Sequence, residues 1–168
     1  SHDLKCISFL DELEKAGVNS FKIEGRMKSA YYVATVVNAY RRMIDKSCDL
    51  ETLEYELETI SHRPYSSGFY FGEVKNNHNN TGEYSQSCLF VGTVLECKDG
   101  EVLVEVRNKI NVDDVLEVLS PSSIGENFKV TEIHDSYGIQ KDVANRPGEH
   151  IYIKCGLNLQ KGDLLRKK

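Results

Sequence analysis

Several features that mark particular classes of protein are missing from this chain. Its 168 residues contain no tryptophan and only three prolines. No apolar run approaches the roughly 18 residues that a membrane-spanning helix needs, and no signal peptide is visible. We therefore expect a globular, cytoplasmic protein that has no membrane partner.

An excess of positive charge is also missing. The formal net charge is −5, with 10 Lys and Arg against 13 Asp and Glu in residues 1–83 and 11 against 13 in residues 84–168. Neither half has the broad basic surface that non-specific nucleic-acid binding requires. A local patch that contacts RNA is not excluded, and its candidate residues are Arg107, Lys109, Lys129, Arg166, Lys167 and Lys168.

The familiar motifs of catalysis and metal binding are absent as well. The five histidines form no H-x-x-x-H or H-E-x-x-H pair, and the sequence has no G-x-S-x-G and no glycine-rich phosphate loop. The five cysteines are odd in number and include no C-x-x-C pair, which indicates reduced thiols. Taken alone, the residues show no catalytic constellation and no complete metal site.

The first 46 residues have the pattern helix, strand, helix. A helix is predicted over residues 3–16, capped by Asp3 and ended by Gly17. A strand is predicted over residues 18–24. Ser29 is a suitable N-cap for the next helix, whose apolar stripe comprises Val33, Val36, Val37, Tyr40 and Ile44.

A single strand leaves backbone groups unpaired on both edges, and so short a segment buries little core. We infer that residues 1–48 are the remnant of a larger α/β fold or take a partner. If the larger fold is a barrel, its missing upstream portion is that partner.

The stretch SFKIEGRMKS, residues 20–29, alternates polar and apolar side chains. Phe21 and Ile23 point one way, whereas Lys22 and Glu24 point the other. In a barrel strand the polar face would look into the lumen near the catalytic end. The candidate substrate-binding residues are then Lys22, Glu24, Arg26 and Lys28, whose cations could hold a phosphate or carboxylate. A solvated strand edge with surface ion pairs explains the alternation equally well.

Residues 49–83 read as a helical and aromatic linker. Leu50, Leu53 and Leu57 predict a short helix within residues 49–61, and HRPYSSGFYFG at residues 62–72 predicts a structured loop with aromatic anchors. Residues 75–83 contain no apolar side chain.

From residue 84 onward, apolar and polar side chains recur with a period of two residues. Two alternating segments flank Lys98-Asp99-Gly100, which is a strong hairpin signal. Further strands are predicted in DVLEVLS, NFKVTEIHD, HIYIKCG and DLLRK. Six short strands with turns between them favour a small closed antiparallel β-barrel over residues 84–168, so the fold class is α+β.

Residues 3–45, and above all FKIEGRMKS followed by YYVATVV and YR, closely resemble the end of the catalytic region of peptidase family U32, the collagenase-like proteases. HRPYSSGFYFG resembles the segment that follows. FVGTVLE, VEVRNKINVDDVLEVLSP and GDLLRK resemble the family's small C-terminal barrel, which is similar to domain two of translation elongation factors. The resemblance implies the C-terminal portion of a longer protein, with residues 1–48 closing a catalytic α/β barrel.

The resemblance also implies chemistry. Some U32 proteins resemble hydroxylating enzymes that carry an iron–sulfur cluster, and the branch with this short barrel resembles enzymes that hydroxylate the wobble uridine of tRNA, with prephenate as the hydroxyl source. The alternatives are a fragment of a genuine collagenase-like peptidase, and a barrel that only binds RNA or protein. Because the cluster cysteines lie mostly upstream, we expect this chain alone to be inactive.

In some members of the family the last cluster cysteine comes directly after a DL pair. Here Lys5 holds that position and Cys6 follows one place later. Cys6 is therefore a candidate cluster ligand, with an ordinary helix-face thiol as the alternative.

Overall fold

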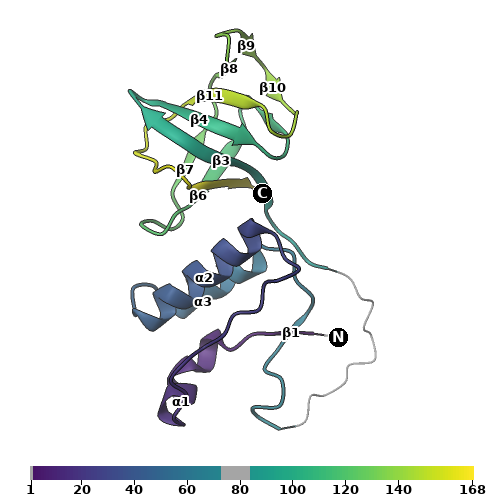
Figure 1. The fold of residues 1–168 in the computed structure, drawn as a ribbon, viewed down its shortest axis with the longest axis vertical. Coiled ribbons are helices and arrows are strands. Elements are labelled where there is room, and N and C mark those ends of the chain that lie inside the picture. Colours follow the sequence, from purple (N-terminus) through teal and green to yellow (C-terminus); the bar gives the residue numbers. More distant parts are fainter. Residues whose placement is uncertain (1, 73–83) are drawn as a thin grey trace. The chain divides into compact units, whose positions relative to one another are not determined.

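The computed structural model describes residues 2–72 and 84–168, which divide into two compact units with the boundary between Ser87 and Cys88 (Figure 1). The segment expected to be a separate linker, residues 49–83, falls in the first unit. Residues 73–83 of that segment, which include all of residues 75–83, lie outside the described residues. Within the described part, no helix is long and apolar enough to cross a membrane.

The first unit contains helices and two very short strands. Its elements are β1 (Asp3–Leu4), η1 (Ile7–Phe9), α1 (Leu10–Lys15), α2 (Ala30–Ile44), α3 (Leu50–Glu58) and β2 (Tyr65–Ser66). The predicted cap of α2 is confirmed, because the hydroxyl of Ser29 accepts a hydrogen bond from the backbone N–H of Tyr32. Asp49 caps α3 in the same way through Thr52.

Helices α2 and α3 pack against each other and provide the core of this unit (Figure 1). Leu53, Leu57 and Ile60 are buried on the α3 side, and Val36 and Ala39 are buried on α2. The predicted apolar stripe of α2 is only partly buried, because Val37 and Ile44 remain exposed. The helix thus has an apolar surface that the described residues do not cover.

The prediction of one helix over residues 3–16 is wrong at its start. Residues 3–4 instead form β1, which pairs in parallel with β2 in the register Asp3↔Tyr65, and α1 begins only at Leu10. The side chain of Asp3 bonds to Arg63, 60 residues away, so a tertiary contact replaces the local cap. The predicted helix end is confirmed at Gly17, whose φ is +94°.

The prediction of a strand over residues 18–24 is also wrong for this chain. The segment belongs to no strand, and the described residues provide no neighbouring ladder for it. A strand exists only where another strand satisfies its N–H and C=O groups. Phe21 and Ile23 are accordingly 38% and 36% exposed.

The second unit is an antiparallel β structure. Its strands are β3 (Leu89–Lys98), β4 (Glu101–Val106), β5 (Ile110–Asn111), β6 (Val115–Leu119), β7 (Asn127–Lys129), β8 (Ile133–Asp135), β9 (Gln140–Lys141), β10 (Val143–Ala144), β11 (His150–Lys154) and β12 (Leu164–Lys167). Eight of them form one sheet in the order β7-β6-β12-β3-β4-β11-β8-β9, and β5 pairs with β10.

The predicted hairpin is confirmed in detail. Lys98 pairs with Glu101, and the two residues between them, Asp99 and Gly100, both have positive φ. Two such residues make the tight turn whose twist suits a β-hairpin. The inward side chains of the hairpin, including Val94, Val102 and Val104, are fully buried in the core of this unit.

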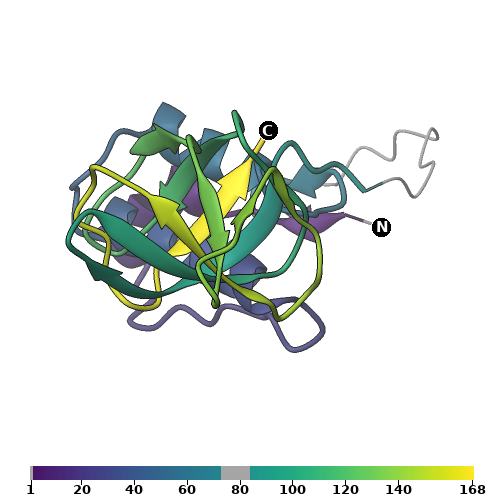
Figure 2. The same ribbon diagram turned by 90° about the horizontal axis from the view of Figure 1, so that it is seen from above.

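The expected set of six strands differs from the observed sheet. NFKVTEIHD, expected as one strand, is divided into β7 and β8, and β5, β9 and β10 were not predicted. The strands curl around the core (Figures 1 and 2), but the ladder does not close: β7 and β9 are its ends. Two further contacts join the segment that follows β4 to the segment that follows β9. They are the short β5–β10 pair and the hydrogen bond from Val112 N to Asp142 O.

Gly92 is a position where the hairpin tolerates no side chain. A Cβ there would lie 2.5 Å from Cγ1 of Val104 and 3.1 Å from the carbonyl oxygen of Glu105. We predict that Gly92→Ala lowers the free energy of unfolding by about 1–3 kcal/mol, the usual cost of overpacking. Urea unfolding followed by the amide NMR signals of β3 and β4 measures this loss.

Gly156→Ala is the matched control in the same unit, because a Cβ at that position meets no atom within 4 Å. We expect it to change the free energy of unfolding by no more than about 0.5 kcal/mol. Equal effects of the two substitutions would contradict the close contact at Gly92.

Candidate functional site

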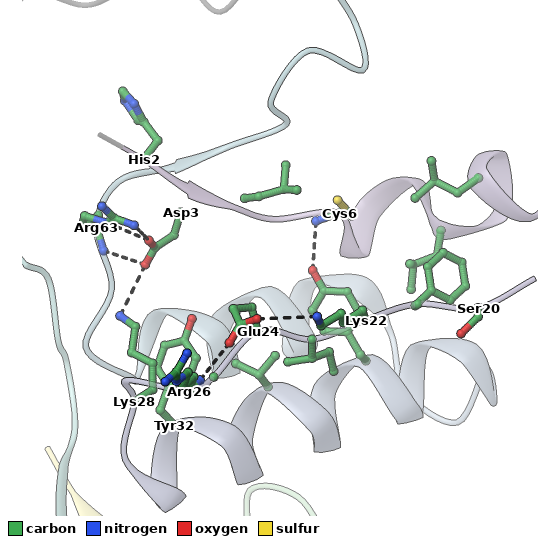
Figure 3. Close-up of a pocket in the computed structure, with 18 of the residues that line it drawn as sticks. His2, Asp3, Cys6, Ser20, Lys22, Glu24, Arg26, Lys28, Tyr32 and Arg63 are labelled. Atoms are coloured by element: carbon green, nitrogen blue, oxygen red, sulfur yellow. Dashed lines mark hydrogen bonds and ion pairs between the residues drawn. The ribbon is translucent and has the colours of Figure 1, made fainter. Parts of the chain in front are cut away.

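The first unit contains a cavity of about 710 Å³ along the unpaired segment. Its walls come from the N-terminal residues, from residues 18–28 and from one face of α2 (Figure 3). Leu10, Phe21 and Ile23 contribute apolar surface, whereas Lys22 and Arg26 contribute cations. An apolar wall with cations at its rim suits an organic anion.

All four predicted substrate-binding residues line this cavity. Glu24 accepts a hydrogen bond from the backbone N–H of Arg26 at 3.1 Å, and its other oxygen lies 4.0 Å from Nζ of Lys22 (Figure 3). The Lys22 and Glu24 side chains are 87% and 71% exposed, so this ion pair contributes little to stability. The charged groups of Lys22 and Glu24 are therefore exposed to solvent.

Lys28, the fourth predicted residue, has a different role. Its Nζ lies 3.7 Å from Asp3 and 3.4 Å from the carbonyl oxygen of Ser61. The same ammonium group lies over the rings of Tyr32 and Tyr84, 4.6 and 5.2 Å from their centroids. Lys28 therefore holds the start of α2 to neighbouring segments rather than offering its charge to a ligand.

Asp3 is the centre of the strongest charge cluster in this unit. One carboxylate oxygen accepts hydrogen bonds from Nε of Arg63 at 2.8 Å and Nη2 at 2.7 Å, and the other accepts the backbone N–H of Arg63 at 3.2 Å (Figure 3). Burial raises the pKa of Asp3, but the hydrogen bonds from Arg63 and the charge of Lys28 outweigh it, so the pKa lies below the usual range.

The sequence analysis missed the role of Asp3 and Arg63. Asp3 has the pattern of a helix cap, and nothing in the spacing of two residues 60 positions apart indicates a contact. The parallel pairing of β1 with β2 decides it, because it places residue 3 beside residue 65. No periodic signal marks a two-residue strand.

Cys6 belongs to no metal site formed by the described residues. Its backbone N–H donates to the hydroxyl of Tyr40 at 2.9 Å, and burial raises the pKa of its thiol. Among residues 2–72 and 84–168, no group of three or more His, Cys, Asp or Glu side chains could hold a metal ion. The residues present therefore do not fit a complete iron–sulfur site, and Cys6 as a single ligand stays a prediction.

Most of the RNA-contact candidates in the second unit are engaged with carboxylates. Arg166 is 1% exposed, so it does not present its charge on the surface. The pairs are Arg107–Glu105 at 3.2 Å, Lys129–Asp113 at 2.8 Å, Arg166–Glu117 at 3.1 Å, Lys167–Asp114, and Lys168–Glu117 at 3.7 Å. Lys109 is exposed, and in the described part of the chain no carboxylate pairs with it.

Both units match models of one protein family. The model of peptidase family U32 matches residues 1–80, and the model of the peptidase family U32 C-terminal domain matches residues 86–166. The chain belongs to peptidase family U32. The predicted resemblance is thereby confirmed for both halves.

Curated U32 relatives have two kinds of name. The chain is 34% identical over 170 residues to tRNA hydroxylation protein P of Escherichia coli, which covers 95% of this chain and 37% of the relative. It is 31% identical to tRNA hydroxylation protein P1 of Bacillus subtilis, covering 98% and 42%. A collagenase of Porphyromonas gingivalis is 37% identical, covering 97% and 48%. The chain thus spans less than half the length of these relatives.

A solved structure matches part of the chain. The C-terminal domain of a U32 peptidase of Geobacillus thermoleovorans is 29% identical, with a TM-score of 0.44, and the match covers 47% of this chain and 91% of that one.

The Asp3 cluster gives a prediction about pH. Because the folded pKa of Asp3 is lowered, its stabilising contribution is present above the unfolded value, about 3.9, and is lost as the pH falls through the folded pKa. At pH 7 we expect Asp3→Asn to speed opening of the β1–β2 pair by about 10- to 100-fold, as for charged hydrogen bonds. Hydrogen exchange of the Lys5 amide, bonded to Ser66 O, measures it after correction for intrinsic rates.

The control is Asp11→Asn, whose partner Lys46 lies 3.9 Å away on the surface; little change is expected there. The difference between Asp3→Asn and the unmodified chain should shrink below about pH 4. A difference that is constant with pH would show that the charge of Asp3 is not what matters.

Proposed function

We propose that this chain is the C-terminal portion of a longer cytoplasmic U32 enzyme that takes part in hydroxylating the wobble uridine of tRNA to 5-hydroxyuridine. The observation that carries this proposal is the similarity to the Escherichia coli and Bacillus subtilis tRNA hydroxylation proteins, which covers 95% and 98% of this chain and so extends over both units.

In the whole protein, residues 1–48 would complete a catalytic α/β barrel, with the upstream chain as their partner. Among the described residues no strand pairs with residues 18–24, and Phe21, Ile23 and Met27 are exposed, Met27 to 91%. Neighbouring barrel strands would satisfy the backbone and cover this apolar surface. The relatives have the length to supply them, since this chain covers only 37–42% of the first three.

Within that barrel, Lys22, Glu24 and Arg26 would line the substrate end. All three face the cavity of the first unit (Figure 3), and a barrel wall opposite them would lower the local dielectric and strengthen their hold on an anion. A buried Glu24 would then need Lys22 or Arg26 as its cationic partner. An iron–sulfur cluster would have to take most of its ligands from upstream residues.

A collagenase-like peptidase is the second candidate. The Porphyromonas gingivalis collagenase, 37% identical over 97% of this chain, favours it. In either protein the second unit would be a module for RNA or protein, similar in form to domain two of elongation factors. Its curled antiparallel sheet and single core support that comparison.

Nucleoside analysis of tRNA separates the two candidates. We expect cells without the full-length protein to lose 5-hydroxyuridine and its derivatives from bulk tRNA, measured by liquid chromatography with mass spectrometry. Re-expression of the full-length protein should restore them, and residues 1–168 alone should not. Unchanged tRNA together with turnover of gelatin or collagen by the purified full-length protein would replace the hydroxylase with the peptidase.

Arg26 provides the sharpest test of the substrate end. In the full-length protein we expect Arg26→Ala to lower tRNA hydroxylation by at least about tenfold, because a charge-assisted hydrogen bond is worth about 1.5–3 kcal/mol. Arg26→Lys should restore only part of the activity, since a lysine cannot bind an anion with two parallel hydrogen bonds.

Arg41→Ala is the control, because Arg41 is an exposed cation in the same unit that pairs with Asp45. It should leave hydroxylation close to normal. Normal hydroxylation by Arg26→Ala would mean that the charges of residues 22–28 only solvate an exposed segment.

A further inference from the structure

Three segments of the second unit converge at one end of its sheet. Gly148 N donates to Val106 O at 2.7 Å and Val106 N donates to Glu149 O at 2.9 Å, so residues 107–109 lie beside residues 146–149. In the register of β8 with β11, Ile151 faces Asp135. The β8–β9 turn therefore continues toward the same end, where β8, β9 and β10 are seen together (Figure 1).

We infer that this end of the sheet is an RNA-binding surface, the 107–146 corner, formed by Lys109, Arg146 and Tyr137. This inference rests on the proposed function and names the surface of the second unit that would take an unpaired loop of tRNA. The inference rests on the distribution of paired and unpaired charges, together with one exposed aromatic side chain on an ordered turn.

Four exposed cations of the second unit have no carboxylate partner among residues 84–168, and two of them lie at this corner; the four are Lys98, Lys109, Arg146 and Lys161. Lys129, Lys154 and Lys167 each pair with a nearby carboxylate. Lys109 and Arg146 are exposed, and within residues 84–168 no carboxylate pairs with either side chain. A cation without a partner can neutralise a phosphate at no cost of a broken ion pair.

Glu149, the acidic residue nearest to Arg146, is already engaged. One of its oxygens accepts the backbone N–H of Arg146 at 3.0 Å, and the other lies 3.1 Å from Nζ of Lys141. Burial raises the pKa of Glu149, but these hydrogen bonds outweigh it and lower the pKa. The carboxylate thus holds the turn in shape and leaves the guanidinium group of Arg146 exposed.

Tyr137 gives the corner an aromatic surface. Its side chain is 88% exposed, yet its backbone is held firmly: Asp135 accepts hydrogen bonds from the N–H groups of Tyr137 and Ile139 at 2.9 and 3.0 Å. An exposed ring on an ordered turn can stack on an unpaired base with little loss of backbone entropy. Cations beside an aromatic ring are the combination that single-stranded RNA loops need.

The test uses the full-length protein and purified unmodified tRNA. We expect Lys109→Ala combined with Arg146→Ala to weaken tRNA binding about tenfold at 0.15 M salt, and to reduce the slope of log K against log salt by about two. Tyr137→Ala should weaken binding about fivefold or more, and Tyr137→Phe should not, because the ring is kept. Fluorescence anisotropy at several salt concentrations gives both quantities.

The control combines Lys129→Ala with Lys154→Ala, which removes the same charge from paired positions; we expect less than a twofold change. If the Lys109/Arg146 variant binds tRNA like the unmodified protein, or no more weakly than this control, the corner is not the RNA surface. Failure of the full-length protein to bind tRNA also overturns the inference. Nucleoside analysis of cellular tRNA decides the proposed function separately, whichever surface binds.

Discussion

The backbone of residues 18–24 is the constraint on which the first unit depends. Among the described residues, no neighbouring strand pairs with the N–H and C=O groups of these seven residues, and Phe21 and Ile23 remain partly exposed. The cavity of the first unit lies along this unpaired segment. In contrast, α2 and α3 are complete by themselves because helices satisfy their own backbone.

Two polar clusters organise this unit around the open segment. Asp3, Arg63 and Lys28 join three stretches of chain through short, mostly buried contacts, and they set the position from which α2 starts. Lys22, Glu24 and Arg26 are exposed, and within residues 2–72 and 84–168 their polar groups interact with one another. The first cluster therefore acts in folding, whereas the second remains able to bind a ligand.

The second unit differs from the first because its strands form hydrogen bonds with one another through their backbone N–H and C=O groups. A continuous core that includes Val91, Val104, Ile151 and Leu165 lies inside the curled sheet, and most surface cations are neutralised by carboxylates on neighbouring strands. One end combines two cations that have no carboxylate partner among residues 84–168, Lys109 and Arg146, with the exposed ring of Tyr137. A net negative unit can thus still present a local surface for an anionic polymer.

Local patterns in the sequence determined the helices, the hairpin and the family. Ser29 was readable as a cap, and Asp99-Gly100 was readable as a two-residue turn, because each acts through residues within a few positions. The alternation in residues 20–26 does not divide the side chains into two faces in the structure, because Phe21 and Ile23 line the same cavity as Lys22, Glu24 and Arg26. Only the tertiary structure decided that Asp3 pairs with Arg63, that Lys28 lies over the ring of Tyr84, and that the chain at Lys109 runs beside the chain at Arg146. The segments brought together are about 35 to 60 positions apart, and strand register and burial position them, which no local pattern records.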